Sequence, residues 1–245
     1  INGLIYIRGQ QAAYADWVAN GAAGWNYESD LPFFRKSESF SGPGSRYHGK
    51  DGELSVTTLR NNHPYCERWV EAAREFGLPS NSDFNGATDY GVGAYQLTIR
   101  GGWRCSASAA FLRPAMSRPN LTVRTHSHVS RIIFEGTRAA SVEWVCDGVR
   151  EQAVASSEVI LSAGAIQSPQ ILQLSGVGPS PLLKTLGILV VADAPEVGAN
   201  LQDHYQARTI VRLRKRVSLN NDVRNPLKIA SMGLQWLLFN RGPLT

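Results

Sequence analysis

The sequence has little that would mark a metal, disulfide or membrane protein. Only 3 of its 245 residues are cysteine, and Cys66, Cys105 and Cys146 form no CxxC pair. This wide spacing argues against a zinc site and against a dense disulfide framework. No apolar run approaches the roughly 18 residues that a membrane-spanning helix requires. We therefore expect no metal site and no transmembrane segment.

Several catalytic and nucleotide-binding motifs are also missing. The sequence has no GxSxG elbow, which a nucleophilic serine of the hydrolase type needs. The spacing from Gly44 to Lys50 resembles a P-loop, but Asp51 stands where Ser or Thr would hold magnesium. Two Gly-x-Gly runs, at 91–93 and 176–178, lack the third glycine of GxGxxG. These absences argue against a serine hydrolase, a P-loop and a complete GxGxxG site.

Charge and histidine patterns exclude two further classes. The formal net charge is only +5, and the basic residues are scattered apart from a cluster at 212–216. A nucleic-acid-binding protein concentrates its positive charge on one face, so we expect no nucleic-acid partner. His126 and His128 share one face of a predicted strand, but no third ligand accompanies them. His48, His63 and His204 are isolated in the sequence.

What the sequence does contain fits a globular protein of mixed α/β class. Hydrophobic residues make up 43%, which is enough for a packed core in one large domain or two modest ones. The sequence has no initiator methionine, opens in mid-pattern at Ile1 and stops at Thr245. We therefore expect it to be an internal portion of a longer protein.

Apolar periodicity predicts the main elements. Helical spacing indicates helices over 62–76, ending at Gly77, and over 226–239. Alternation from Leu121 to Val129, continued to Phe134, predicts a strand, with returning strands at 140–145 and 152–155. Together these strands predict an antiparallel meander. A further strand is expected over 207–213.

A second pattern follows the meander. The apolar run Val159–Leu161 predicts a strand buried on both faces. Ala163-Gly164-Ala165 would form a small-residue turn, and Ser168-Pro169 would cap a helix over 170–174. Small residues and a helix N-terminus favour close approach of an anion. The same turn is also found in α/β proteins with nothing bound, so both interpretations remain.

Three groups of segments together resemble the GMC (glucose–methanol–choline) family of FAD-dependent oxidoreductases. The first is 1–9 (INGLIYIRG), followed by Trp17 and 24–27 (GWNY). The second runs from 118–123 (RPNLTV) to 128–129 (HV). The third is 162–179 (SAGAIQSPQILQLSGVGP) with 197–204 (VGANLQDH). The resemblance spans essentially the whole chain.

This resemblance implies a partial dinucleotide-binding α/β fold with an antiparallel meander. Residues 1–205 would be the middle of an FAD-binding domain, with a helical and loop insertion at about 30–115. Residues 206–245 would begin a sheet-and-helix substrate domain. The cofactor FAD would meet the chain at seven residues. These are Asn2, Gly3, Leu4 and Ile5 along the flavin ring, Val129 at the adenine through its main chain, and Ala163 and Gly164.

The family's chemistry is removal of a hydride from an alcohol by the flavin, while a histidine takes the hydroxyl proton. The resemblance therefore implies a small alcohol as substrate and leaves the electron acceptor open among oxygen, a quinone and a dye. The family's GxGxxG and catalytic histidine have no counterpart here. The alternatives are a non-catalytic nucleotide-binding or structural module and a lyase of the hydroxynitrile type on the same fold.

Overall fold

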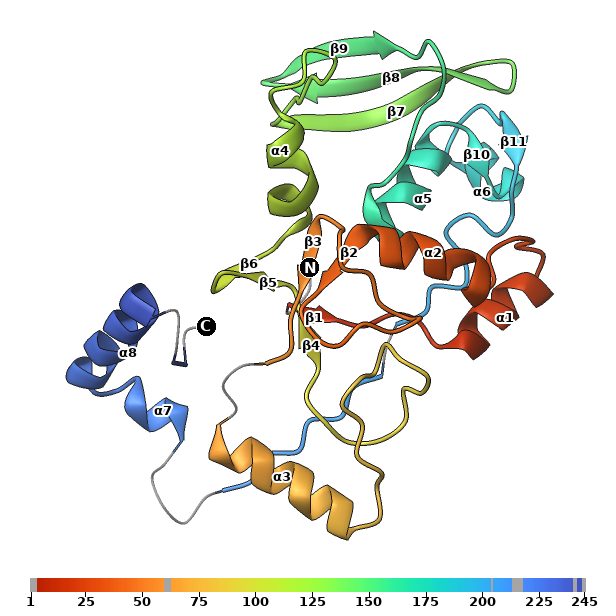
Figure 1. The fold of residues 1–245 in the computed structure, drawn as a ribbon. Coiled ribbons are helices and arrows are strands. Elements are labelled where there is room, and N and C mark those ends of the chain that lie inside the picture. The colour runs from red at the N-terminus through yellow and green to blue at the C-terminus, as the bar shows by residue number, and fades with distance from the viewer. Residues whose placement is uncertain (1–3, 60–62, 204, 213–217, 240–241, 244–245) are drawn as a thin grey trace. The chain divides into compact units, whose positions relative to one another are not determined.

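The computed structural model describes residues 4–59, 63–203, 205–212, 218–239 and 242–243 (Figure 1). The chain divides into two compact units, one formed by residues up to 121 together with those from 212 onward, the other by 122–211. Both contain helices and small sheets, so the expected mixed α/β class is confirmed. In the described ranges no helix is both long and apolar enough to cross a membrane.

The first unit combines helices with short two-stranded pairings. Its elements are β1 (Ile5–Tyr6), α1 (Gln11–Ala19), α2 (Tyr27–Ser37), β2 (Glu38–Phe40), β3 (Leu54–Val56), α3 (Pro64–Glu75), β4 (Gln96–Leu97), β5 (Ile99–Arg100), β6 (Trp103–Arg104), the π-helical η1 (Ser108–Leu112), α4 (Arg113–Ala115), α7 (Leu219–Asp222) and α8 (Pro226–Phe239). The pairs are β1–β4 and β5–β6, both antiparallel, and β2–β3, which is parallel. The helices expected over 62–76 and 226–239 are confirmed.

Local chemistry explains α2. The side chain of Asn26 accepts a hydrogen bond from the backbone N–H of Ser29 and so caps the helix. Acidic residues occupy the first turn and basic residues the last, which complements the helix dipole. Tyr14, Tyr27 and Leu31 are buried together, and the ring of Tyr14 meets that of Tyr27 edge-on at 5.7 Å. This aromatic cluster fixes α1 against α2.

A group of charged side chains, three of them buried, joins four segments of the first unit. Glu38 accepts from Arg8 Nη2 at 2.6 Å and from the backbone N–H of Gly49 at 3.1 Å. Its other neighbour is His48, whose Nδ1 lies 2.7 Å from Glu38 Oε1 while Nε2 lies 3.0 Å from Asp83 Oδ2. Glu38 is fully buried and His48 is 3% exposed. We call Arg8, Glu38, His48 and Asp83 the charged hub.

The hub alternates positive and negative charges, and this arrangement sets the ionisation of its members. Burial alone would raise the pKa of Glu38, but the hydrogen bond from His48 and the charge of Arg8 lower it below its ordinary value. Burial would likewise lower the pKa of His48, but its bonds to Glu38 and Asp83 raise it instead. Both shifts favour the charged form of the group.

Amide side chains extend the hub into the loop over 79–93. Asn85 Oδ1 accepts from the backbone N–H of Arg8 at 2.7 Å. Gln96 Nε2 donates to Asp83 Oδ1 at 2.8 Å, and Asn85 also bonds Gln96. Asn85, Gln96 and Glu38 are all nearly inaccessible to solvent. The long loops of this unit are thus ordered by buried polar bonds more than by apolar packing.

Gly49 shows how closely the loop approaches α2. A Cβ atom at this position would lie 1.8 Å from the carbonyl oxygen of Arg35. Only glycine allows this contact, which places His48 beside Glu38. His48, isolated in the sequence, is therefore a central buried residue of the fold.

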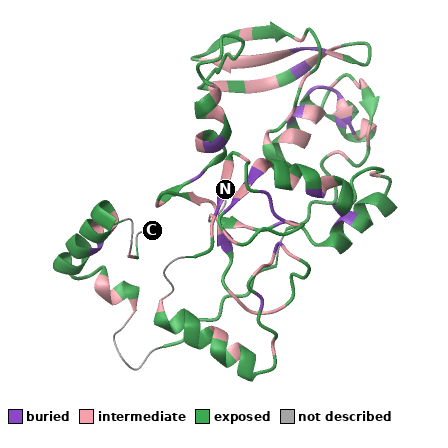
Figure 2. Cartoon of the chain, in the orientation of Figure 1, coloured by how far each residue is buried: buried purple, intermediate pink, exposed green. Residues whose placement is uncertain are grey.

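The second unit is built on the predicted meander. Its elements are β7 (Ser127–Glu135), β8 (Arg138–Cys146), β9 (Val149–Val154), α5 (Gly164–Leu174), β10 (Val177–Gly178), α6 (Ser180–Thr185) and β11 (Ala192–Asp193). The antiparallel order β7–β8–β9 confirms the meander. Asp147 and Gly148, both at positive φ, make the two-residue turn between β8 and β9. Figure 2 shows burial concentrated in β8, whereas β9 is almost wholly exposed.

Two polar side chains, those of Ser175 and Asp193, hold α5 and α6 in this unit. The hydroxyl of Ser175 accepts from the backbone N–H of Ile132 in β7 at 2.8 Å and donates to the carbonyl of Ile171 in α5 at 2.5 Å. Asp193 Oδ1 accepts from the backbone N–H of Ser180 at 2.9 Å, which caps α6 and lowers the pKa of Asp193. The parallel pair β10–β11 brings Asp193 to that helix end.

Some predicted elements are wrong. Val159–Leu161 belongs to no strand, and Ile160 is 79% exposed, because an apolar run forms a buried strand only where partner strands meet it. The helix starts at Gly164, four residues before the predicted Ser168 cap, and Pro169 lies inside it. Ser168 reaches back to accept from the N–H of Ala163. The strand of the meander begins at Ser127, and 207–212 form none, while Leu213 lies outside the described residues.

The hub predicts a large stability loss on neutralising its central carboxylate. Glu38→Gln keeps the shape but removes the counter-charge of buried Arg8 and one of the two carboxylates that face His48, so we expect the free energy of unfolding to fall by about 3–5 kcal/mol. Glu28→Gln is the matched control, because its ion pair with Arg46 is largely exposed and should change stability by less than about 1 kcal/mol. Denaturant titration measures both. Equal losses in the two variants would refute the role of the hub.

The hub also predicts a dependence of stability on pH. The His48 contribution is complete below its ordinary pKa of 6.5 and is lost as pH rises through the raised pKa of the folded state. The Glu38 contribution is complete above its ordinary pKa of 4.5 and is lost as pH falls through the lowered one. We expect the hub to stabilise most between these values. Free energies of unfolding measured across pH should lose the alkaline decline in His48→Gln but keep it in the control His126→Asn.

Candidate functional site

A pocket lies between the start of β7 and one side of α5, with a volume of about 530 Å³. Pockets for small ligands commonly measure roughly 300–1,000 Å³. Its lining consists of Ser127, His128, Val129, Ser130, Ala163, Gln167, Gln170, Ile171 and Leu174. None of these side chains is acidic, and the only basic type among them is a histidine. We call it the β7–α5 pocket.

The strand wall of this pocket is an open sheet edge. Among the described strands, β7 pairs only with β8, so its other edge is available for hydrogen bonding. The register shifts between Val129 and Arg131, which marks a β-bulge at the pocket. Bulges are common beside binding sites because they redirect backbone and side chains. The pocket thus offers main-chain N–H and C=O groups to a ligand.

The helix wall supplies both apolar and polar groups. Ile171 and Leu174 present aliphatic side chains, while Gln167 and Gln170 are exposed amides. Ala163 stands at the N-cap position of α5, and the first turn of that helix has no acidic residue. The positive end of the helix dipole is therefore uncompensated next to the pocket lining.

The structure brings two of the predicted cofactor residues together. Val129 and Ala163, 34 positions apart in the sequence, line the same pocket. Gly164 follows Ala163 and begins α5 with φ of +91°, which glycine adopts without strain. The role of Val129, Ala163 and Gly164 as cofactor contacts stays a prediction.

The other predicted residues belong to the first unit. Leu4 has φ of +77°, an unusual value for a non-glycine residue, and its carbonyl accepts from the backbone N–H of Thr98 at 2.9 Å. Such strained positions occur often at ligand-binding backbone. Ile5 lies in β1 and is 44% exposed. Asn2 and Gly3 lie outside the described residues.

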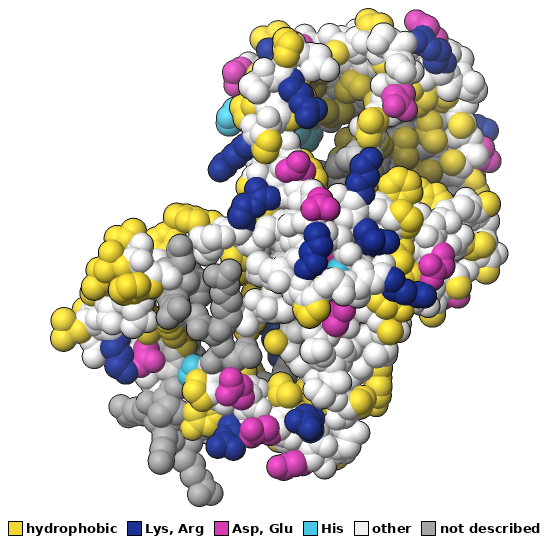
Figure 3. Space-filling view, viewed as in Figure 1, with side chains coloured by type: hydrophobic (Ala, Val, Ile, Leu, Met, Phe, Trp, Pro, Cys, Tyr) yellow, Lys and Arg dark blue, Asp and Glu magenta, His cyan; other side chains and the backbone are white. Residues whose placement is uncertain are grey.

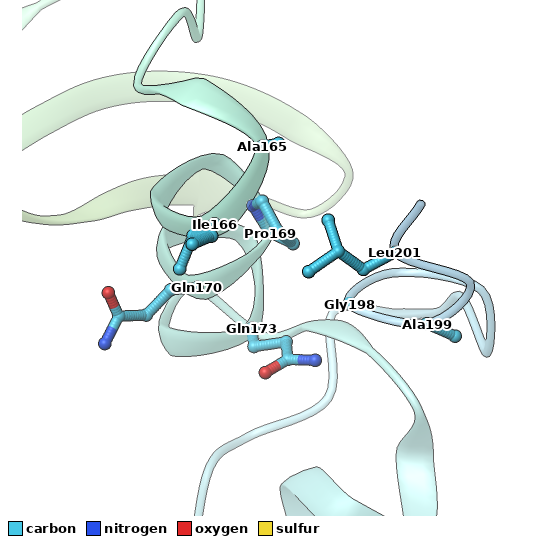
Figure 4. A pocket seen from close by; sticks show the side chains of 8 residues that line it. All are labelled: Ala165, Ile166, Pro169, Gln170, Gln173, Gly198, Ala199 and Leu201. Atoms are coloured by element: carbon cyan, nitrogen blue, oxygen red, sulfur yellow. The ribbon is translucent and has the colours of Figure 1, made fainter. Parts of the chain in front are cut away.

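A smaller pocket of about 260 Å³ lies on α5 beside the loop over 198–201 (Figure 4). Its lining is Ala165, Ile166, Pro169, Gln170, Gln173, Gly198, Ala199 and Leu201. Gln173 Nε2 donates to the carbonyl of Val197 at 2.8 Å and so ties the loop to the helix. Gln170 lines this pocket and the β7–α5 pocket.

Two residues near the β7–α5 pocket, Ser175 and Trp144, could not be identified from the sequence pattern. Ser175 follows α5 and bonds β7, and a serine at a helix end usually indicates only a local cap. Trp144, opposite Val129 in the sheet register, has a buried Nε1 that lacks a hydrogen-bond partner within the described part of the chain. Its side chain lies on the same face of the sheet as that of Val129.

Metal ligation finds no support in the described residues, where no group of three His, Cys, Asp or Glu side chains is placed to hold an ion. The hub contains such residue types, but both ring nitrogens of His48 already face carboxylates. A ligating imidazole needs a free lone pair.

Comparison with known proteins gives a family match over most of the chain. Residues 1–206 match the family model described as GMC oxidoreductase. The chain is 44% identical over 237 residues to the mitochondrial choline dehydrogenase of Homo sapiens, which covers 97% of the chain and 40% of that protein. It is 42% identical over 207 residues to an alcohol dehydrogenase [acceptor] of Pseudomonas putida, covering 83% of the chain and 38% of that protein.

A solved structure agrees over the full chain. An FAD-dependent oxidoreductase from Chaetomium thermophilum superimposes with a TM-score of 0.89 at 30% identity, covering all of this chain and 45% of that one. The chain therefore spans less than half the length of these relatives.

Proposed function

The chain belongs to the GMC oxidoreductase family, and we propose that it forms part of an FAD-dependent enzyme that oxidises the CH–OH group of an alcohol. In this proposal residues 1–205 contribute the middle of the FAD-binding domain, including the insertion at about 30–115. Residues 206–245 begin the substrate domain. The names of the relatives, choline dehydrogenase and alcohol dehydrogenase, support an alcohol as the substrate class.

The single observation that carries the proposal for this chain is the shared pocket of Val129 and Ala163. Both were predicted as cofactor contacts from separate segments of the sequence. An adenine ring carries hydrogen-bond donors and acceptors on its edge, and a free strand edge offers the complementary groups. Aliphatic Ile171 and Leu174 suit the flat apolar faces of such a ring.

The charge of the pocket lining also suits the adenosine end of FAD. Its lining has no acidic, lysine or arginine side chain, which suits a neutral ring better than a phosphate. The uncompensated start of α5, next to Ala163, suits the negative phosphates that adjoin adenosine in FAD. One ligand with a neutral base and an anionic linker satisfies both features. We propose Gly164 and the strained backbone at Leu4, with Asn2, Gly3 and Ile5, as further contacts.

FAD, when bound, would supply the hydride-accepting chemistry of the reaction. The part of this chain is to bind and orient. The main chain near Val129 holds the adenine end, and the aliphatic wall excludes water from it. We assign no residue of this chain to take the hydroxyl proton. The electron acceptor stays open among oxygen, a quinone and a dye.

Filling the β7–α5 pocket should weaken FAD binding. Ala163→Leu adds three carbon atoms to the lining at the helix start, and we expect the dissociation constant for FAD to rise by at least about tenfold, the equivalent of roughly 1.4 kcal/mol. Flavin fluorescence titration of protein produced from the complete gene measures this. Val154→Leu, on the exposed strand β9 of the same unit, is the control and should leave affinity unchanged. Unaltered FAD affinity in Ala163→Leu would remove the pocket from the proposal.

The protein made from the complete gene should be yellow and should lose its flavin colour when an alcohol is added without oxygen. Bleaching occurs because reduced flavin absorbs little visible light. Choline, benzyl alcohol and a primary alkyl alcohol would be tried in parallel, with the matching aldehydes or betaine aldehyde as controls. A flavin-bearing protein that no alcohol bleaches, yet that cleaves a cyanohydrin, would favour the lyase alternative. A protein with no flavin would favour the non-catalytic one.

The 245-residue chain alone should bind FAD weakly and oxidise no alcohol, because the expected pyrophosphate-binding glycine motif and the catalytic histidine have no counterpart in it. Flavin retention after gel filtration and reduction of a dye with added alcohol measure both properties. A yellow preparation of the chain that reduces the dye would contradict this expectation.

A further inference from the structure

The hydroxyl of Ser175 both accepts and donates a hydrogen bond. It stands at the C-cap of α5 and is 8% exposed. Its Oγ accepts from the backbone N–H of Ile132 at 2.8 Å and donates to the carbonyl of Ile171 at 2.5 Å. One hydroxyl therefore bonds β7 and α5 at once, and its rotation is fixed by both bonds.

The bond to Ile132 marks where the open edge of β7 ends. Because the N–H of Ile132 points to Ser175, it faces away from β8, on the edge that β7 does not share with another described strand. The pocket lining on β7 stops at Ser130, two residues earlier. A protein hydroxyl thus occupies the strand edge directly beyond the stretch that lines the pocket.

The bond to Ile171 belongs to α5, the helix wall of the β7–α5 pocket. Ile171 is itself a lining residue, and Gln167, Gln170 and Leu174 of the same helix line the pocket with it. This bond lies within α5, where the backbone N–H of Ser175 also bonds the carbonyl of Ile171 at 3.0 Å. It holds the hydroxyl against the last turn of the helix, and the bond to Ile132 joins that turn to β7. The spacing between the two walls of the β7–α5 pocket is consequently determined at Ser175.

We propose that Ser175 is a positioning residue that sets the width of the β7–α5 pocket for an adenine ring. This inference rests on the proposed function, since it takes adenine as the occupant. Ser175 touches no ligand in this role. Ser175 keeps a fixed distance between the open edge of β7 and the helix wall. At this distance the backbone groups of β7 can distinguish the hydrogen-bond donors of the base from its acceptors.

The test uses protein from the complete gene, freed of flavin, and two probes that differ only in the base. Adenosine diphosphate carries an amino group where inosine diphosphate carries a carbonyl. The unaltered protein should prefer adenosine diphosphate. In Ser175→Ala we expect the affinity for it to fall about tenfold and the preference over inosine diphosphate to shrink toward one, because the edge no longer meets the base in a fixed position. Calorimetric titration measures both constants.

Matched variants separate positioning from stability. Ile132→Val trims the same strand but keeps its backbone bond, so it should lower Tm while retaining the preference. Thr185→Ala deletes a comparable hydroxyl bond, from Thr185 Oγ1 to the carbonyl of Pro181 in α6, and should leave binding unchanged. Ser175→Thr keeps the hydroxyl and should restore the preference. If Ser175→Ala does not fold, Ser175→Cys replaces it, because this change weakens both bonds at nearly constant volume. Its preference for adenosine diphosphate over inosine diphosphate is then measured in the same way.

The outcomes are distinct. A Ser175 variant that keeps the full preference for adenosine diphosphate, or that loses no more of it than Ile132→Val, overturns the inference and leaves the proposed function standing. An unaltered protein that binds neither adenosine diphosphate nor FAD overturns the proposed function itself. Loss of preference in Ser175→Ala and Ser175→Cys with recovery in Ser175→Thr supports the inference.

Discussion

The first unit depends on a buried carboxylate, that of Glu38. A charge with no solvent access is tolerated only where it is paired and fully hydrogen-bonded. Arg8, on the segment after β1, and the adjacent residues His48 and Gly49, on the loop before β3, meet this requirement. Because the carboxylate demands all three partners, the segment between β1 and α1, the start of β2 and the loop before β3 must meet at one point. Short strands and long loops thereby acquire a single arrangement.

The second unit follows a different constraint, the unshared edge of β7. A sheet edge leaves backbone donors and acceptors that need partners. Part of this edge is satisfied internally, by the hydroxyl of Ser175 at Ile132, and part lines the β7–α5 pocket. The N–H of Ile132 is thus bonded within the protein, whereas residues 127–130 of the same strand line the pocket. In the proposed function, main-chain groups of this edge recognise the edge of the adenine ring, and the aliphatic side chains of α5 cover its face.

The sequence predicted those features that depend on local periodicity. The meander and the helix Pro226–Phe239 follow from alternating and helical apolar patterns. Val129 and Ala163 came from the family resemblance, and their shared pocket could not be derived from spacing alone. His48 and Ser175 escaped prediction because their importance comes from partners 10 to 43 positions away. One buried histidine or serine carries no periodic signal of such contacts.

Several apolar side chains are exposed although the periodicity of the sequence predicts that they are buried. The run Val159–Leu161 has the composition of a strand buried on both faces, yet Ile160 is 79% exposed. The helix α8 likewise presents Leu227, Leu237 and Phe239 at 66% exposure or more, and hydrophobic side chains gather over it in Figure 3. Large exposed apolar surfaces usually mark contacts with further protein or ligand. Since the chain spans 40% of the human relative, its proposed place within a longer enzyme accounts for both surfaces. Composition sets which residues require burial, whereas the partners that bury them are set by the remainder of the fold.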